Sequence, residues 1–333
     1  MKRGLVKAAL DIYPMAEWSR RLDEVQQAMD SRGLDWALVY GDVSASDDIS
    51  YLTNICVYWN EGVLAVPRTG KPEFVTKLSA RVLTWMKRVS VVDSFHSTPQ
   101  LGQRLAEVVG TDSRVAIVDA GRWPASLLED TTASVGRELE RVDQLISSLR
   151  ATPAEDEAAR LRSLGAELGR AWEASDTPGE VELALRRAGC VDVLIDDDAG
   201  NTDISAQFGH LWVRSARSTT SLAQLAKDAL ALAAEGLRAD VTGPQIAARL
   251  DEVPAFRHSG QDLRIHVSLG PVVGGDLSVA QAAQAGSASL LSIDVSDGTT
   301  TARVADTYLI ADDGAESLTG GSDERVAAMG AQQ

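Results

Sequence analysis

The chain has 333 residues, a length that suggests two domains, each large enough for its own hydrophobic core. Its net charge of −16 argues against nucleic acid as a partner, and no run of about 18 apolar residues predicts a membrane span. Two cysteines, Cys56 and Cys190, are too few for a disulfide framework and favour the reducing cytoplasm.

The N-terminal half alternates helical and strand patterns. Apolar residues recur at helical spacing within 16–32, and Gly33 follows as a C-terminal cap. Apolar runs bounded by turn residues at 34–40 and 62–67 predict buried strands. Because strands and helices continue to alternate, we expect a mixed α/β domain over residues 1–148.

A second unit is expected to begin with a helix near residue 152. Thr152, Pro153 and Glu155 have the spacing of an N-cap, a first-turn proline and the glutamate of a capping box. This pattern predicts that the helix starts at Thr152 and runs to about residue 175.

The rest of the second unit reads mainly as long strands with amphipathic helices between them. Residues 202–217 predict a long strand or hairpin, and 221–237 a strongly amphipathic helix. Residues 290–314 predict paired strands around an Asp-Gly turn. The predicted class is α/β (α+β), with a second domain over 152–325.

Several segments resemble the creatinase/prolidase family. Arg20 and the runs 33–39 and 49–54 resemble its N-terminal domain, and 149–162 and 303–319 resemble the opening and close of its pita-bread domain. The resemblance covers nearly the whole chain. It implies a creatinase-type α/β domain followed by a pita-bread domain.

The resemblance also implies where a metal pair would bind. Peptidases of this family hold two metal ions with two Asp, one His and two Glu, because hard cations need converging anionic oxygens. Asp203 corresponds to the first Asp, but Arg214 stands at the second, eleven residues later. Gln261 stands at the His, Asp294 at the first Glu and Ala305 at the second. Since a guanidinium repels a metal ion, we expect no metal and no other cofactor.

Histidines could still carry chemistry, because creatinase itself, as the resemblance implies, uses a histidine without metal. The family's substrate-facing His corresponds to Ser268, and His266 lies two residues earlier, on the same strand face, with Arg264 beside it. His258 and His210 are further candidates. Each of the three can also be an ordinary structural histidine.

Arginines on the same segments invite two interpretations. Arg214, Arg217, Arg264 and Arg303 either pair with acidic neighbours or replace the metal's charge and bind a carboxylate. We expect the substrate to be bound by Arg214, Asp203, Gln261, Arg264 and Asp294.

Three functions remain open at this point. The first is a metal-independent enzyme that uses histidine acid–base chemistry on a small, polar, carboxylate-bearing substrate derived from an amino acid. The alternative is a non-catalytic pseudo-peptidase that binds a peptide or metabolite. The third is a metalloenzyme with unusual ligands, namely Asp203, His210, Asp294 and Asp306.

The resemblance further implies a homodimer. The apolar run 55–59 is a candidate interface or lid, although burial in its own domain explains it equally well. The expected partners are a small molecule and a second copy of the chain, with no nucleic acid and no membrane.

Overall fold

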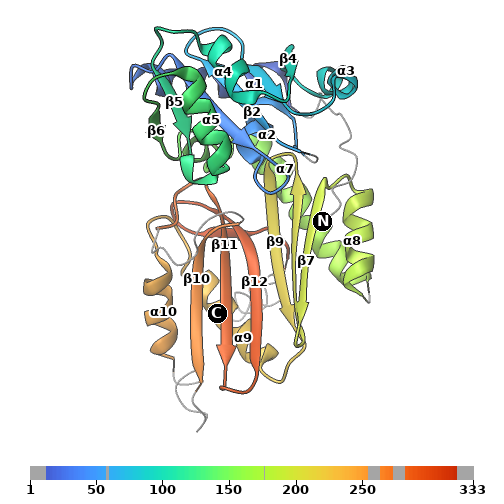
Figure 1. The fold of residues 1–333 in the computed structure, drawn as a ribbon. Coiled ribbons are helices and arrows are strands. Elements are labelled where there is room, and N and C mark those ends of the chain that lie inside the picture. Colours follow the sequence, from blue (N-terminus) through green and yellow to red (C-terminus); the bar gives the residue numbers. More distant parts are fainter. Residues whose placement is uncertain (1–12, 58–59, 176, 254–262, 273–281, 321–333) are drawn as a thin grey trace. The chain divides into compact units, whose positions relative to one another are not determined.

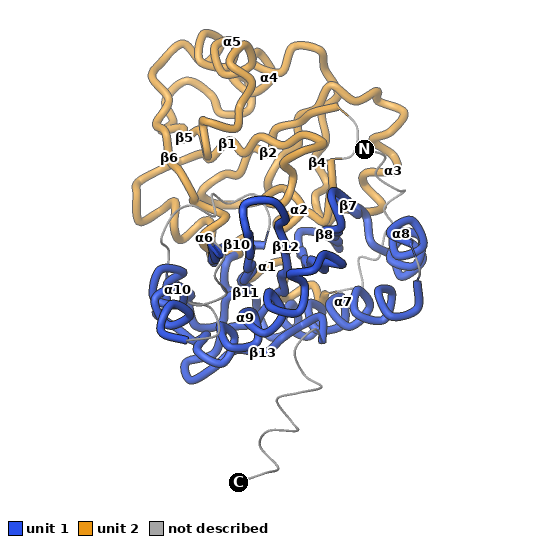
Figure 2. Tube along the Cα trace, turned by 90° about the horizontal axis from the view of Figure 1, so that it is seen from below, with its two compact units in different colours: residues 1–4, 151–333 blue, residues 5–150 orange. Residues whose placement is uncertain are grey.

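The computed structural model describes residues 13–57, 60–175, 177–253, 263–272 and 282–320 (Figure 1). The described residues divide after Arg150 into two compact units (Figure 2). Each unit has its own sheet and its own hydrophobic clusters. None of the described helices combines the length and the apolar character that crossing a bilayer requires.

The first unit is built on a mixed six-stranded sheet. Its order is β4-β3-β2-β1-β5-β6, with β1 antiparallel to β2 and parallel to β5. The strands are β1 (Trp36–Gly41), β2 (Gly62–Pro67), β3 (Glu73–Thr76), β4 (Ser94–Ser97), β5 (Val115–Val118) and β6 (Glu140–Val142). The strands predicted at 34–40 and 62–67 are therefore confirmed as β1 and β2.

Helices cover both faces of this sheet, which is why β1 is apolar on both sides. Ala37 and Val39 belong to one buried cluster and Leu38 and Tyr40 to another. Residues of α1, α2 and α3 join the first cluster, and residues of α4 and α5 join the second. The helices are α1 (Met15–Asp30), α2 (Asp47–Thr53), α3 (Ala80–Val89), α4 (Leu101–Val109), α5 (Ala125–Val135) and α6 (Ser147–Arg150).

These clusters show where the described part of the apolar run 55–59 packs. Ile55, Cys56 and Val57 are buried in the first unit, and Ile55 and Val57 pack in the same cluster as Val39. Residues 58–59 lie outside the described residues. The described part of this run therefore packs into the core of its own unit.

The second unit is built on an antiparallel sheet in the order β10-β11-β12-β9-β8-β7, with β13 beside β12. The hairpin predicted at 202–217 and the strand pair around the Asp-Gly turn are confirmed. Together with the mixed first sheet, this confirms the predicted α/β class. The strands are β7 (Asp192–Asp198), β8 (Asn201–Phe208), β9 (Leu211–Ser218), β10 (Arg264–Pro271), β11 (Ala288–Ser296), β12 (Thr301–Ile310) and β13 (Ala315–Ser317).

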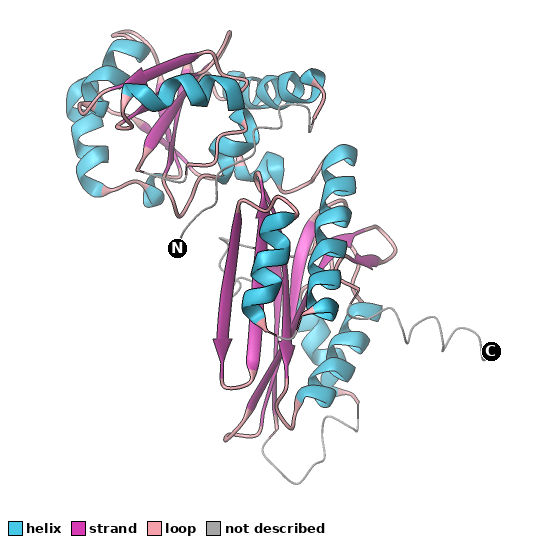
Figure 3. Ribbon diagram, turned by 90° about the vertical axis from the view of Figure 1, so that its right-hand side faces the viewer, coloured by secondary structure: helices cyan, strands magenta, loops and turns pink. Residues whose placement is uncertain are grey.

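The two faces of the second sheet differ in chemistry. Leu291, Ile293 and Val295 of β11 pack into the cluster formed with α9 and α10, whereas Ser292 and Asp294 alternate with them. The helices lie on one side of this sheet (Figure 3). They are α7 (Glu155–Ala174), α8 (Pro178–Arg187), α9 (Ala223–Glu235) and α10 (Gly243–Asp251). The helix predicted at 221–237 corresponds to α9.

The start of α7 differs from the prediction. The N-cap is Ala154, two residues after Thr152, and the Ala154 amide donates to Glu157 Oε2 at 2.8 Å. Glu157 is buried and its other oxygen lies 2.6 Å from His210. A glutamate fixed by a distant histidine therefore sets the helix start, instead of the local Thr-Pro pattern.

The packing of α7 against the C-terminal segment yields the first test. A Cβ at Gly165 would lie 2.7 Å from the carbonyl carbon of Leu318, which is backbone and cannot turn away. We expect Gly165→Ala to lower the free energy of unfolding by about 1–3 kcal/mol through overpacking, although Ala normally favours helix. Urea unfolding measures the change.

The matched control is Gly179→Ala in α8. Nothing lies within 4 Å of a Cβ at Gly179, so Ala should be neutral or stabilise by up to about 1 kcal/mol there. Equal effects of the two substitutions would contradict the packing of α7 against Leu318.

Candidate functional site

The register of the second sheet gathers charged residues on the face opposite the apolar one. Paired residues on neighbouring strands project to the same side. Asp203 pairs with Ala216, Ala216 with Ala305, and Ala305 with Ser292. Alternation then places the following residues on the same face, here called the polar face: Asp203, Arg214, Arg264, His266, Asp294 and Arg303.

The first feature of the polar face is an ion pair between β8 and β9. Arg214 Nε lies 2.7 Å from Asp203 Oδ1 and 3.0 Å from Oδ2, and Nη2 also donates to Oδ2. Asp203 is buried and Arg214 is half-buried. A fork of this kind fixes both side chains, because the planar guanidinium matches the carboxylate.

A second, similar ion pair joins β11 and β12. Arg303 stands directly opposite Asp294, with Nε 2.9 Å from Oδ1 and Nη2 3.1 Å from Oδ2. These hydrogen bonds to Asp294 raise the pKa of Arg303 above its ordinary value, and the charges of Asp203 and Asp196 add to the effect. Arg303 thus also interacts electrostatically with Asp203, the carboxylate of the first pair.

Small and apolar side chains lie between the two ion pairs. Ala216, Ala305 and Leu290 form a buried cluster of their own, and Ser292 pairs with Ala305. The result is a floor without charge, flanked by two guanidinium groups and two carboxylates.

His266 and Arg264 lie at the far edge of the polar face. His266 is exposed and stands directly opposite Asp294, and Arg264 is exposed two residues before it. Three strand spacings, about 14 Å, separate β10 from β9, and the register puts Gly270, four residues along β10 from His266, level with Arg214. His266 and Arg214 share a face, but His266 is the direct neighbour of Asp294 and not of Arg214. His258 and Gln261 lie outside the described residues.

His210 has different surroundings. It lies in the turn between β8 and β9, buried with 3% of its side chain exposed, and its Nε2 is 2.6 Å from Glu157 Oε1 of α7. This pair ties the hairpin turn to the start of α7. The ring of His210 therefore contacts a helix on the other side of the sheet from the polar-face residues.

Asp306 also lies on the helix-covered side, because it alternates with Ala305 and Thr307. It accepts hydrogen bonds from the hydroxyl groups of Ser317 and Thr319 and, at 2.7 Å, from the Thr307 amide. Burial raises the pKa of Asp306 from its ordinary 3.8 to about 6. The structure thus does not bring Asp203, His210, Asp294 and Asp306 together.

Arg217 belongs to the helix-covered side too. Its guanidinium lies over the Trp172 ring of α7, 4.8 Å from the ring centroid, and burial lowers its pKa. Of the four arginines considered from the sequence, Arg217 therefore does not line the polar face. The odd spacing between Arg214 and Arg217 within one strand contained this information.

The role of Arg303 as partner of Asp294 was not predicted, although the sequence held a signal for it. Asp294 and Arg303 lie at equal distances from the turn at 297–300, so a tight hairpin must pair them. Counting residues outward from the Asp-Gly turn along both strands of the hairpin identifies this pair.

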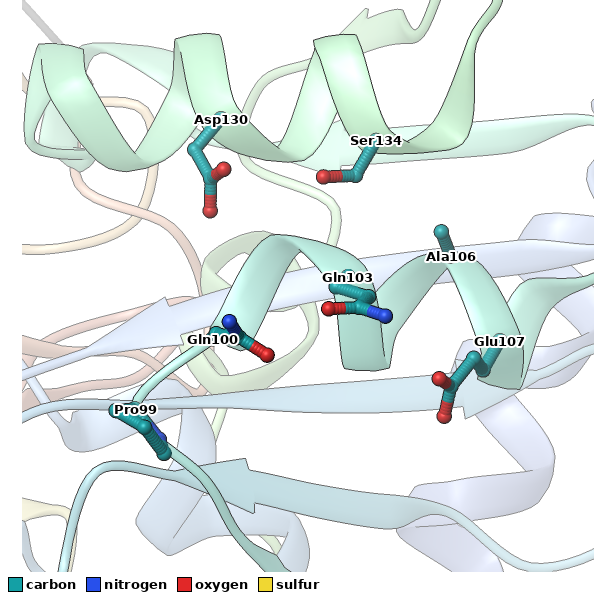
Figure 4. A pocket seen from close by; sticks show the side chains of 7 residues that line it. All are labelled: Pro99, Gln100, Gln103, Ala106, Glu107, Asp130 and Ser134. Atoms are coloured by element: carbon teal, nitrogen blue, oxygen red, sulfur yellow. The ribbon is translucent and has the colours of Figure 1, made fainter.

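A shallow groove of about 650 Å³ lies between α4 and α5 of the first unit. Figure 4 shows amide, carboxylate and hydroxyl side chains along its two helices. Asp130 there accepts a hydrogen bond from the Gly102 amide at 3.2 Å, near the start of α4. This carboxylate is thus used for helix capping. The groove is lined by Pro99, Gln100, Gln103, Ala106, Glu107, Asp130 and Ser134.

Comparison with known proteins agrees with this architecture. Residues 21–152 match the family model of the creatinase/prolidase N-terminal domain. The sequence has no significant match among curated proteins.

Solved structures resemble the whole chain at low sequence identity. The Xaa-Pro dipeptidase from Bacillus anthracis superposes with a TM-score of 0.67 at 14% identity, covering 91% of this chain and 97% of its own. The prolidase from Pyrococcus horikoshii OT3 gives 0.68 at 14% identity, with coverages of 90% and 98%. Dipeptidase PepE from Mycobacterium ulcerans gives 0.63 at 19% identity, with coverages of 92% and 96%. The fold is therefore a creatinase-type domain followed by a pita-bread-like domain, as predicted.

The raised pKa of Asp306 predicts how stability depends on pH. A folded-state pKa of about 6 against an ordinary 3.8 means that the folded protein binds the proton more tightly. The contribution of protonated Asp306 to the stability of the folded protein is fully present below pH 3.8. It is lost as the pH rises toward and through 6. Asp306→Asn removes this titration. We expect wild type to lose a few kcal/mol relative to Asp306→Asn between pH 4 and 7.

The measurement is urea unfolding of both proteins across this pH range. The difference between the two proteins cancels the titrations that they share. A wild-type protein that gains stability over the variant as pH rises would contradict the desolvation of Asp306.

Proposed function

We propose that this chain belongs to the creatinase/prolidase superfamily and binds its ligand without a metal pair. The observation that carries the proposal is the Asp203–Arg214 ion pair. Residues eleven apart, where the resemblance implies two metal-binding aspartates, here form a guanidinium–carboxylate fork. The fork uses the carboxylate oxygens that a cation would need.

The candidate donors in the described part of the chain do not fit a pair of divalent ions. Such ions require several anionic oxygens around one point. Asp203 and Asp294 each face an arginine, and Ala305 carries no donor. Within the described part of the chain, no three His, Cys, Asp or Glu side chains gather where they could hold a metal ion.

The same residues suit a small ligand that carries a carboxylate. The bonds to Asp203 use Nε and Nη2 of Arg214, and those to Asp294 use the same atoms of Arg303. The Nη1 groups lie outside these pairs and can bind a carboxylate. We therefore propose an amino-acid-derived ligand, in keeping with the dipeptidases that share the fold.

His266 is the candidate for proton transfer in a metal-independent enzyme. It is exposed on the polar face and stands opposite Asp294, so a ligand bound between the ion pairs and β10 can reach its ring. Its distance from Arg214 supports the alternative, a non-catalytic pseudo-peptidase that binds a peptide or metabolite. A homodimer and a cytoplasmic location remain predictions in either case.

Metal content gives a direct test of the proposed loss. We expect well under one equivalent of manganese, zinc, iron or cobalt in purified protein, because Arg214 repels cations at the site. We also expect its melting temperature to be the same with and without a chelator. A stoichiometric metal that a chelator removes together with stability would refute the proposal.

Substitution of the polar-face residues tests the binding function and separates it from catalysis. The probes are a panel of amino acids, N-methylated amino acids and dipeptides, each compared by calorimetry with the matching carboxylate that lacks nitrogen. We expect Arg214→Ala to weaken the best binder by about 1.5–3 kcal/mol, or roughly ten- to a hundredfold. Arg170→Ala, on an exposed part of α7, is the control.

His266→Ala should leave that affinity nearly unchanged. If the bound probe is turned over, the same variant should slow turnover by about two to four orders of magnitude. Turnover that survives this substitution would exclude His266 as the acid–base group. Binding without turnover in wild type would favour the pseudo-peptidase.

A further inference from the structure

The second sheet has a seam between β9 and β12. β8 and β9 pair along their whole length, and so do β11 and β12. Between β9 and β12, both fully described, Ala216 with Ala305 is the single register pair. Beyond that pair the two strands need another link, because buried backbone N–H and C=O groups require partners.

Thr307 of β12 supplies this link with its side chain. Its Oγ1 accepts a hydrogen bond from the Arg214 amide at 2.8 Å and donates one to the Arg214 carbonyl oxygen, also at 2.8 Å. Thr307 is fully buried. The Thr307 hydroxyl thus provides a hydrogen-bond partner for both the N–H and the C=O group of Arg214, whose side chain forms the ion pair with Asp203.

The position of Thr307 is itself held from both sides of the strand. Its own amide donates to Asp306 Oδ1 at 2.7 Å, on the helix-covered side. Its β-branched side chain has few rotamers, so the hydroxyl has little freedom to leave Arg214. Arg214 and Thr307 are 93 residues apart in the sequence. The contact therefore depends on the tertiary structure and not on the intrinsic strand propensity of β9.

We propose that Thr307 is a positioning residue that sets the backbone of Arg214 and thereby directs its guanidinium to the ligand site. The inference rests on the proposed role of Arg214 in ligand binding. Without the hydroxyl, the Arg214 amide and carbonyl lose their partners, β9 shifts at the seam, and the fork with Asp203 loosens.

The test reads Arg214 directly and needs no ligand. The Nε–H resonance of Arg214 is assigned in nitrogen-15 NMR spectra as the signal absent from Arg214→Lys. We expect Thr307→Val to move this resonance toward that of an exposed arginine and to speed exchange of the Arg214 amide about tenfold or more. Thr307→Ser keeps the hydroxyl and should restore both.

Thr301→Val is the matched control on the same strand and face. The Thr301 hydroxyl binds Ser296 Oγ, so this variant should leave the Arg214 signals in place. An unchanged Nε–H resonance in folded Thr307→Val would overturn the proposal. So would equal shifts in Thr301→Val.

Wild-type protein provides a further measurement if Thr307→Val does not fold. The Arg214 amide faces β12, whereas the Ser215 amide faces β8 in the regular ladder. Comparable protection of both amides supports the proposal, and rapid exchange at Arg214 overturns it. Failure of ligand binding, with these signals as expected, would remove the proposed function of Arg214 and leave its positioning by Thr307 intact.

Discussion

The pleat of the β-strand is the constraint on which the second unit depends. Successive side chains project to opposite sides of a strand, so a residue's parity decides whether it joins the core or the polar face. Asp306 and Thr307 are neighbours in sequence, yet one binds Ser317 and Thr319 beneath the helices and the other binds Arg214 at the seam. Arg214 and Arg217 separate in the same way.

The alternation of side chains along a strand also shows which parts of the fold and of the candidate site can be predicted from the sequence. The strands, the two hairpins and the α/β class followed from apolar runs and turn residues, and the place of Asp203 and Arg214 on one strand face followed from their order. Counting parity would also have removed Asp306 from a shared metal site with Asp203 and Asp294. The surroundings of His210 could not be foreseen, because its partner Glu157 is 53 residues away on a helix. The start of α7 failed for the same reason, since that buried glutamate fixes it.

In the proposed replacement of metal ions by arginines, the guanidinium groups neutralise the remaining carboxylates. The metal site that the resemblance implies offsets four carboxylates with two divalent ions. Here the two ion pairs combine two carboxylates with two guanidinium groups, so these four residues are also neutral, with half the charges of each sign. Fewer partly buried charges need less compensation for lost hydration. Each guanidinium also ties two neighbouring strands, as a shared metal ion would.

The two ion pairs differ in what holds them, and this bears on which arginine a ligand can use. Arg303 stands opposite Asp294 in a continuous ladder, so backbone pairing of β11 with β12 alone aligns that fork. Arg214 reaches Asp203 across a diagonal and lies at the seam, where the Thr307 hydroxyl takes over from the ladder. Its alignment therefore depends on one side chain that is anchored, through Asp306, to the C-terminal segment 315–319. Packing of that segment against Gly165 and Gly169 of α7 connects the helix-covered side to the geometry of the polar face.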